Sequence, residues 1–294
     1  MTLNLIFKVV IRMIKTTAGF AAILLLAGCA SMISSATTRM ADNITLAILN
    51  QNDLETVRLG APAYLLMLDG LIEGDAENTD LLLAGAKLYS SYTSAFIEDD
   101  ERAKRLAEKS FGYAKTALCI EVVNLCQALP AKLTEFERLL DDTNINDLPT
   151  LYGFATAWAS WIQVNADDWN ALTDLPKLTA LFEQCLVFDE KFDDGGSHLY
   201  LGVLSTQLPP SLGGKPEKGR AHFERANEIS AGKNLMINVL MAQHYARMVF
   251  DQELHDQLLE AVLTEPAEVP GLTLVNTIAK LQASELLEES VDFF

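Results

Sequence analysis

The residue with the clearest chemical role in this sequence is a cysteine near the start of the chain. Cys29 follows Leu26, Ala27 and Gly28, which close a short apolar run over residues 18–27. That run comes after a basic stretch over residues 8–15 that contains no acidic residue. A basic segment, an apolar segment and small residues before a cleavage point are typical of a secretory signal. We therefore predict that residues 1–28 are removed as a signal peptide and that the chain acts outside the cytoplasm.

The position of Cys29 resembles that of the lipidated cysteine in bacterial lipoprotein signals. The resemblance implies cleavage before Cys29, a diacylglyceride on its thiol and an acyl chain such as palmitate on its new amine. Each buried methylene adds about 0.8 kcal/mol of membrane affinity, so several chains anchor a protein stably. A transmembrane helix is the alternative, but the apolar run falls short of the roughly 20 residues that spanning requires. Ala30 stands where Asp usually signals inner-membrane retention, so we expect anchoring on the periplasmic face of the outer membrane.

No other residues form a recognisable catalytic or metal-binding motif. The four histidines (His198, His222, His244 and His255) match no HExxH pattern, and no GxSxG or P-loop occurs. We interpret the histidines as surface or capping residues. The acidic runs at 98–101 and 141–142 lack EF-hand spacing and are typical of solvated helix starts. We expect no enzymatic activity, no metal and no cofactor.

Three further cysteines, Cys119, Cys126 and Cys185, leave an odd thiol in an oxidising compartment. Cys119 and Cys126 are seven residues apart, which is about 10 Å along a straight helix. That distance is too long for a disulfide. We therefore expect both cysteines to be small buried side chains without a bridge.

The charge balance excludes one class of partner. The whole chain carries a formal charge of −18, and removal of the signal peptide, with its three basic residues, leaves about −21. Such a surface repels nucleic acid and anionic lipid, so we expect no nucleic-acid binding. Half of the residues are apolar, which is enough for a sizeable core and unlike a disordered chain.

The elements that must position these residues are helical almost throughout. Between 101 and 118 the apolar residues recur with a 3.6-residue period, and charged residues fill the opposite face. Similar patterns predict helices over the following ranges: 31–50, 53–73, 79–96, 119–140, 148–164, 174–190, 196–206, 216–230, 234–249, 251–264 and 272–289. Gly, Pro, Asn and Asp clusters separate them, and no strand pattern is found. Pro62 lies inside one apolar stretch, where we expect it to kink or delay the helix.

One spacing occurs twice along the chain. Ala107-x3-Phe111-x2-Ala114 returns as Gly219-x3-Phe223-x2-Ala226, the small-x3-Phe-x2-Ala spacing of the second helix of a tetratricopeptide repeat. The small residues let two helices approach closely while the Phe fills the space between turns. Chance amphipathy is the alternative. If the repeat is real, Phe111 and Phe223 are buried within their hairpins.

Four stretches (60–74, 81–97, 155–165 and 196–226) make the chain resemble the T-component of TRAP transporters, the TatT family of tetratricopeptide-like periplasmic lipoproteins. They include Leu88-Tyr89-x2-Tyr92-x2-Ala95-Phe96 and Leu212-Gly213-Gly214-Lys215-Pro216. The match covers nearly all of the mature chain, in the order of the family. Gly219 and Ser205 depart from the strict repeat consensus of Ala and an aromatic residue, which puts tight packing of that hairpin in doubt.

The resemblance implies an all-α fold of stacked tetratricopeptide-like hairpins that form a solenoid or bundle around a hydrophobic cavity or pore. It implies a homotrimer that docks the periplasmic substrate-binding P-component of a TRAP transporter, with a hydrophobic ligand as a further possibility. We divide the chain into a signal peptide (1–28), a lipidated tether (29–40) and one helical domain (41–294).

Aromatic residues in the family-matching stretches are the candidates for contact with a ligand. The six selected for a cavity are Tyr89, Tyr92, Phe96, Trp158, Trp161 and Tyr200. Tyr152 and the proline-containing loop 208–216 are further candidates. The alternative is that these rings are core packing between hairpins.

A second function also fits the sequence. Tetratricopeptide lipoproteins serve as scaffolds for assembly of the outer membrane or envelope. The four family stretches favour the transport role over this scaffold role.

Overall fold

The computed structural model describes residue 39 and residues 43–208, 210–212 and 214–294. The chain divides into two units after Ile44, and the description below concerns the second unit, Thr45–Phe294. Of the first unit, the described residues (39, 43 and 44) are helical. Cys29 and the predicted signal peptide lie outside the described residues. Within the described part, none of the helices has the length and apolar character needed to cross a membrane.

The described residues form helices and no strand, which confirms the predicted all-α fold. After the helical residues 45–49 come α2 (Leu54–Gly74), α3 (Thr79–Phe96), α4 (Asp100–Glu121), α5 (Val123–Gln127), α6 (Leu133–Asp141), η1 (Ile145–Asp147), α7 (Leu148–Val164), α8 (Trp169–Leu172) and α9 (Leu175–Phe188). They are followed by η2 (Phe192–Gly195), α10 (Gly196–Ser205), η3 (Pro210–Leu212), α11 (Pro216–Ile229), α12 (Met236–Leu240), the π-helical η4 (Met241–Ala246), α13 (Arg247–Val249), α14 (Gln252–Thr264) and α15 (Thr273–Phe293).

Polar residues at the starts of several helices explain why they begin where they do. Asp53, Asn78, Asp99 and Asp251 each accept a hydrogen bond from a backbone N–H of the first turn of α2, α3, α4 and α14. These side chains satisfy N–H groups that the helix itself leaves free.

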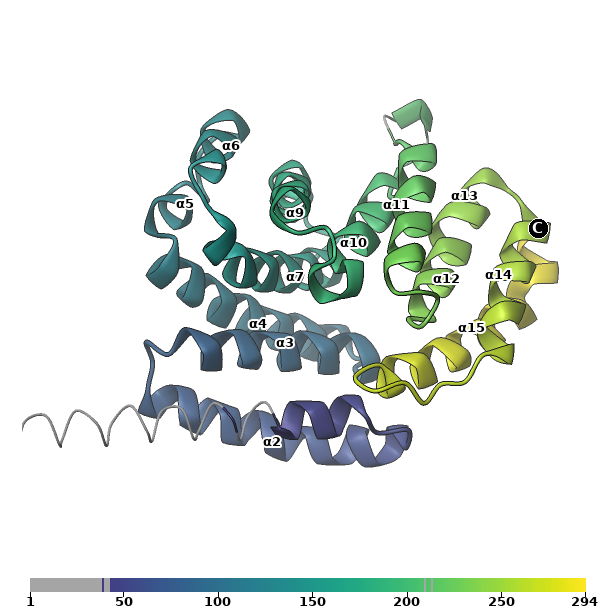
Figure 1. Ribbon diagram of the computed structural model, residues 1–294, viewed down its shortest axis with the longest axis horizontal. Helices are drawn as coiled ribbons and strands as arrows, with labels where there is room; N and C mark the ends of the chain where they lie inside the picture. Colours follow the sequence, from purple (N-terminus) through teal and green to yellow (C-terminus); the bar gives the residue numbers. More distant parts are fainter. Residues whose placement is uncertain (1–38, 40–42, 209, 213) are drawn as a thin grey trace, which may run out of the picture. The chain divides into compact units, whose positions relative to one another are not determined.

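Neighbouring helices pack as antiparallel hairpins, of which α3–α4 and α10–α11 are the most extensive (Figure 1). The helix α7 packs on α3 and α4, and α9 packs on α7. The last helix, α15, also contacts α2, the first long helix of the unit. The array is the stacked-hairpin architecture that the repeat spacing predicts.

The repeated small residues lie where two helices touch. Ala107, Ala114 and Ala226 have no exposed surface, and Phe223 is fully buried as predicted. Phe111 is only partly buried, so the prediction for it is met in part.

The hairpin of α10 and α11 is tightly packed, although Gly219 and Ser205 depart from the repeat consensus. A Cβ atom at Gly219 would lie 2.6 Å from Thr206 Cγ2 and 3.0 Å from the carbonyl oxygen of Gly202. Gly219 therefore replaces the consensus Ala because α10 and α11 approach too closely for any side chain at this position.

Pro62 does not delay its helix, because α2 begins at Leu54 and continues through Pro62 to Gly74. Proline removes the N–H that would bond to the carbonyl of the residue four positions earlier, which is Arg58. The hydroxyl of Tyr92 donates to that carbonyl instead, at 3.2 Å. A side chain of α3 thus compensates for the missing bond in α2.

The predicted single helix over 119–140 is wrong. The chain bends at Val122, where φ is −125° and ψ is 61°, and α4, α5 and α6 follow as separate helices. The bend brings the Cα atoms of Cys119 and Cys126 to 5.0 Å, and the two residues form a disulfide. The prediction of unbridged cysteines fails because it assumed a straight helix. Cys185 is buried as a free thiol, and burial raises its pKa to about 12.

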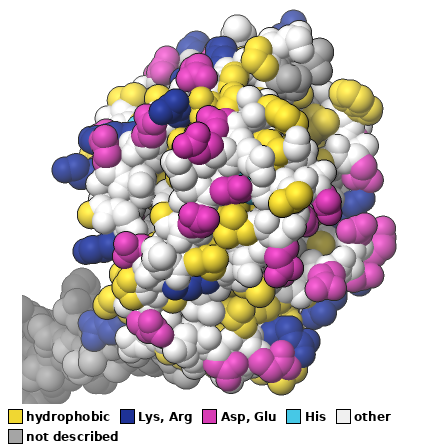
Figure 2. All heavy atoms as spheres, turned by 90° about the vertical axis from the view of Figure 1, so that its right-hand side faces the viewer, with side chains coloured by type: hydrophobic (Ala, Val, Ile, Leu, Met, Phe, Trp, Pro, Cys, Tyr) yellow, Lys and Arg dark blue, Asp and Glu magenta, His cyan; other side chains and the backbone are white. Residues whose placement is uncertain are grey.

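The surface is acidic, with apolar side chains between the charges. Figure 2 shows Asp and Glu side chains spread over one face, together with scattered hydrophobic groups. The sequence carries 40 Asp and Glu residues against 22 Lys and Arg residues, so negative charge dominates the surface as a whole.

Candidate functional site

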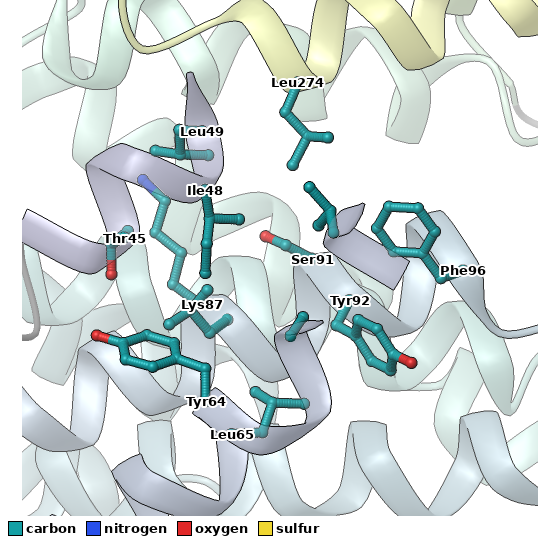
Figure 3. Close-up of a pocket in the computed structure, with 13 residues that line it drawn as sticks. Thr45, Ile48, Leu49, Tyr64, Leu65, Lys87, Ser91, Tyr92, Phe96 and Leu274 are labelled. Atoms are coloured by element: carbon teal, nitrogen blue, oxygen red, sulfur yellow. The ribbon is translucent and has the colours of Figure 1, made fainter. Parts of the chain in front are cut away.

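A small apolar pocket lies among residues 45–49, α2, α3 and α15 (Figure 3). Of the six aromatic residues selected from the sequence, Tyr92 and Phe96 line it. Its volume is about 40 Å³, whereas pockets for small-molecule ligands usually hold roughly 300–1,000 Å³. In this structure the pocket is smaller than an organic ligand, and binding of such a ligand stays a prediction.

Tyr92 and Phe96 form the aromatic wall of this pocket. The rings of Tyr92 and Phe96 lie 5.6 Å apart, centroid to centroid. The Tyr92 hydroxyl is fixed by its bond to the Arg58 carbonyl. Lys87 also lines the pocket, and its ammonium group pairs with Asp193 Oδ1 at 3.5 Å.

Tyr89 belongs to a separate polar network rather than to the pocket lining. Its hydroxyl donates to Asp69 Oδ2 at 2.8 Å, and the hydroxyl of Tyr113 donates to Asp69 Oδ1 at 2.7 Å. Lys109 donates to the same carboxylate at 2.5 Å. Partial burial alone would raise the pKa of Asp69, but these three bonds outweigh it and lower that pKa. The network ties α2, α3 and α4 together.

Trp158 and Trp161 lie on α7 against Phe111 of α4. Trp158 is buried, and its ring also contacts Phe136 and Phe154. Trp161 is partly exposed, and its indole N–H donates to Glu108 Oε2 at 2.6 Å. This group is the aromatic part of the core between α4 and α7.

Tyr200 stacks on Phe182 at a centroid distance of 4.6 Å and meets Tyr152 edge to face. The hydroxyl of Tyr152 donates to Asp193 Oδ2 at 2.7 Å. Burial raises the pKa of Tyr200 to about 12, so it stays protonated at neutral pH. The six candidates are therefore distributed over four places in the fold, and the structure does not gather them around one cavity.

The sequence analysis missed a histidine pair. Nδ1 of His198 on α10 and Nδ1 of His222 on α11 lie 2.9 Å apart, a hydrogen-bonding distance. His198 is buried, so the prediction of a surface or capping position is wrong for it, whereas His222 is partly buried. Burial lowers the pKa of both, to about 4 for His222. Such a bond needs one ring to donate and the other to accept, which two neutral imidazoles can do.

Charged groups surround the histidine pair. Glu190 Oε2 lies 3.7 Å from Nε2 of His198, and Glu190 also pairs with Arg225. Next to His222, Lys218 pairs with Glu183 at 2.7 Å. Within the described residues, no group of three or more His, Cys, Asp and Glu is arranged to hold a metal ion.

The two remaining histidines lie on different helical segments. Phe250, with φ of 58°, ends α13 and lies between His244 in η4 and His255 in α14. His255 is fully buried, however, and its Nδ1 lies 2.8 Å from Asp256 Oδ1. The prediction of a surface position is therefore wrong for His255 as well.

Two predicted features lie wholly or partly outside the described residues. Cys29 is one, and in the loop 208–216 residues 209 and 213 are not described. The lipidation of Cys29 stays a prediction.

Comparison with known proteins places the chain in a family. A search of curated proteins gives no match to it. The model of the family described as TRAP transporter T-component matches residues 50–294, which is nearly the whole unit described above. The chain therefore belongs to the TRAP transporter T-component family, whose members are accessory proteins of transport.

Proposed function

We propose that this protein is a lipid-anchored accessory protein on the periplasmic face of the outer membrane that docks the substrate-binding P-component of a TRAP-type transporter. The observation that carries the proposal is the family match over residues 50–294. Cys29, after a signal-like segment, supports the anchor and the periplasmic location. The anchor keeps the helical unit near the membrane while its surface stays free for the partner.

The stacked hairpins support a docking role because such arrays present extended surfaces to partners. The net negative charge favours a partner with a basic face and predicts association that slows as salt is added. The proposal includes the homotrimer that the family resemblance implies.

A hydrophobic ligand is the second part of the proposal. The lining of the pocket that contains Tyr92 and Phe96 is almost entirely apolar and includes only a few polar atoms. Such a lining suits an apolar or amphipathic molecule. Binding would require Phe96, which is partly buried at the end of α3, to move and enlarge the present volume. Trp158, Trp161, Tyr89 and Tyr200 are held in packed or hydrogen-bonded groups, so they are weaker candidates for contact.

A binding experiment tests the proposal. The mature chain is immobilised, and the purified P-component is passed over it at several salt concentrations. We expect saturable binding whose association rate falls as salt rises. An unrelated periplasmic binding protein is the control. Equal signals from the P-component and the control would contradict the docking role. The envelope-assembly scaffold, the other function that the sequence allows, has no specific observation in its favour here.

A further inference from the structure

The helix α2 has an apolar strip on the side that faces away from its own core. The strip consists of Leu59, Ala63, Leu66 and Gly70, all of them exposed. Leu59 is 64% exposed and Leu66 is 70% exposed, although both are large apolar residues. Their spacing of four, three and four residues places them on one face of the helix. We call these four residues the outer strip.

Nothing in residues 43–208, 210–212 and 214–294 accounts for the outer strip. A glycine inside a helix costs about 1 kcal/mol relative to alanine. Gly70 lies in the interior of α2, and a Cβ atom there would meet no other group within 4 Å. The exposed leucines likewise gain nothing from burial. Both features are explained if another surface packs on this face.

Large and small residues alternate along the strip in the order Leu, Ala, Leu, Gly. If a second α2 lies antiparallel, with residue 59 opposite residue 70, every leucine faces a small residue: Leu59 faces Gly70, and Leu66 faces Ala63. A parallel pair would instead place leucine on leucine and glycine on glycine. We propose that the outer strip is the contact between two copies of this chain, packed antiparallel about a two-fold axis between residues 64 and 65.

Charges at the ends of the strip agree with this arrangement. Arg58 already pairs with Glu55 on its own helix, at 2.6 Å. In the antiparallel register it lies beside Glu73 of the other copy, which is exposed on α2. Each end of the contact therefore has a cation between two carboxylates. The strip itself carries no charge, which matters because two mature chains of formal charge about −21 otherwise repel each other.

The contact is short, because the twelve residues from Leu59 to Gly70 span about 18 Å of helix. A single pair of helices of this length buries less than the roughly 1,000 Å² of a stable interface, so we expect weak pairing in dilute solution. Tethering both copies to one membrane by Cys29 raises their effective concentration. That last step rests on the proposed anchor, whereas the pairing itself does not. A two-fold contact can join two single chains or two trimers.

Cysteine cross-linking tests the register. The variants Ala63→Cys and Leu66→Cys are mixed as the mature soluble chain and oxidised. The soluble chain carries Cys29→Ser, so that it has no free thiol at its start. The other native cysteines do not interfere, because Cys119 and Cys126 are bonded and Cys185 is buried. We expect the mixed 63–66 disulfide to form at least about tenfold faster than a disulfide with Val187→Cys, a control on α9 where Val187 is 75% exposed.

The relative rates of disulfide formation distinguish an antiparallel contact, a parallel contact and no contact. A mixed 63–66 disulfide that forms faster than the 63–63 and 66–66 disulfides supports the antiparallel pair. Faster 63–63 and 66–66 disulfides would overturn it in favour of a parallel contact. Rates no higher than those of the Val187→Cys control would overturn the contact altogether. Adding Leu59→Glu, at an exposed position that should leave folding unchanged, is expected to slow the 63–66 reaction. Binding of the P-component is measured in a separate experiment, so absence of the α2 contact would leave the proposed docking function unaffected.

Discussion

The hydroxyl of Tyr92 on α3 donates a hydrogen bond to the carbonyl of Arg58 on α2 at 3.2 Å. Pro62 leaves that carbonyl without its helical donor. Tyr92→Phe keeps the ring but removes this donor, and we expect a loss of about 0.5–1.5 kcal/mol in the free energy of unfolding. Urea denaturation of the two proteins measures it.

A second substitution separates this effect from general packing. Pro62→Ala restores a backbone donor for the Arg58 carbonyl, so in that background Tyr92→Phe should cost less. An undiminished cost in the double variant would show that the tyrosine hydroxyl does not compensate for Pro62.

The hairpin of α10 and α11 depends on the absence of a side chain at Gly219. Gly219→Ala places a Cβ atom against Thr206 and the backbone of Gly202, and we expect a loss of about 1–3 kcal/mol. Gly112→Ala on α4 is the matched control, because nothing lies within 4 Å of its Cβ position. The control should gain about 0.5–1 kcal/mol from helix propensity. Chemical denaturation that ranks both variants alike would contradict the close approach.

The histidine pair predicts a dependence of stability on pH. The pKa of His222 falls to about 4 in the folded chain, chiefly through burial, and is about 6.5 in the unfolded chain. Below pH 6.5 the unfolded state gains a proton that the folded state excludes. Stability is therefore complete above about pH 6.5 and is lost progressively as the pH falls towards 4. The pKa of His198 is lowered as well and adds to the same trend.

Urea midpoints measured between pH 7.5 and pH 5 test this trend. His222→Gln should flatten the decline relative to the unaltered chain. Asn227→Gln, on the same helix, changes no titrating group and serves as the control. Parallel pH profiles for all three proteins would count against the pair as the source of the dependence.

Lipidation is tested at its proposed site. Cys29→Ser removes the only thiol that the signal-like segment offers, and we expect the protein to move from the membrane to the soluble periplasmic fraction or to stay uncleaved. Cys185→Ser is the control, because that thiol is buried in the helical unit. Unchanged membrane retention of a Cys29→Ser chain that has lost residues 1–28 would rule out the lipid anchor.

Local sequence patterns predicted most helices well. The predicted ranges 79–96 and 148–164 coincide with α3 and α7, because Asn78 caps the first and Pro149 opens the second. The disulfide between Cys119 and Cys126 was missed because helical periodicity does not show a bend at Val122.

The histidine pair could not be predicted from local sequence patterns, because it forms only when α10 and α11 pack together. The packing of the two helices brings the histidines together. A Cβ atom at Gly202 would touch the ring of Phe223, which fixes the register of the two helices. In that register His198, one turn before Gly202, comes next to His222. The aromatic candidates could not be ranked in the same way, since core and pocket residues have the same types and spacing.

The central claim is that this chain works with a TRAP transporter. The most direct measurement is affinity capture of the tagged full-length protein from gently solubilised membranes, followed by quantitative mass spectrometry, with an unrelated lipoprotein as the control bait. The account predicts that the P-component is enriched with this chain and not with the control. Absence of the P-component together with selective recovery of outer-membrane assembly factors would contradict it.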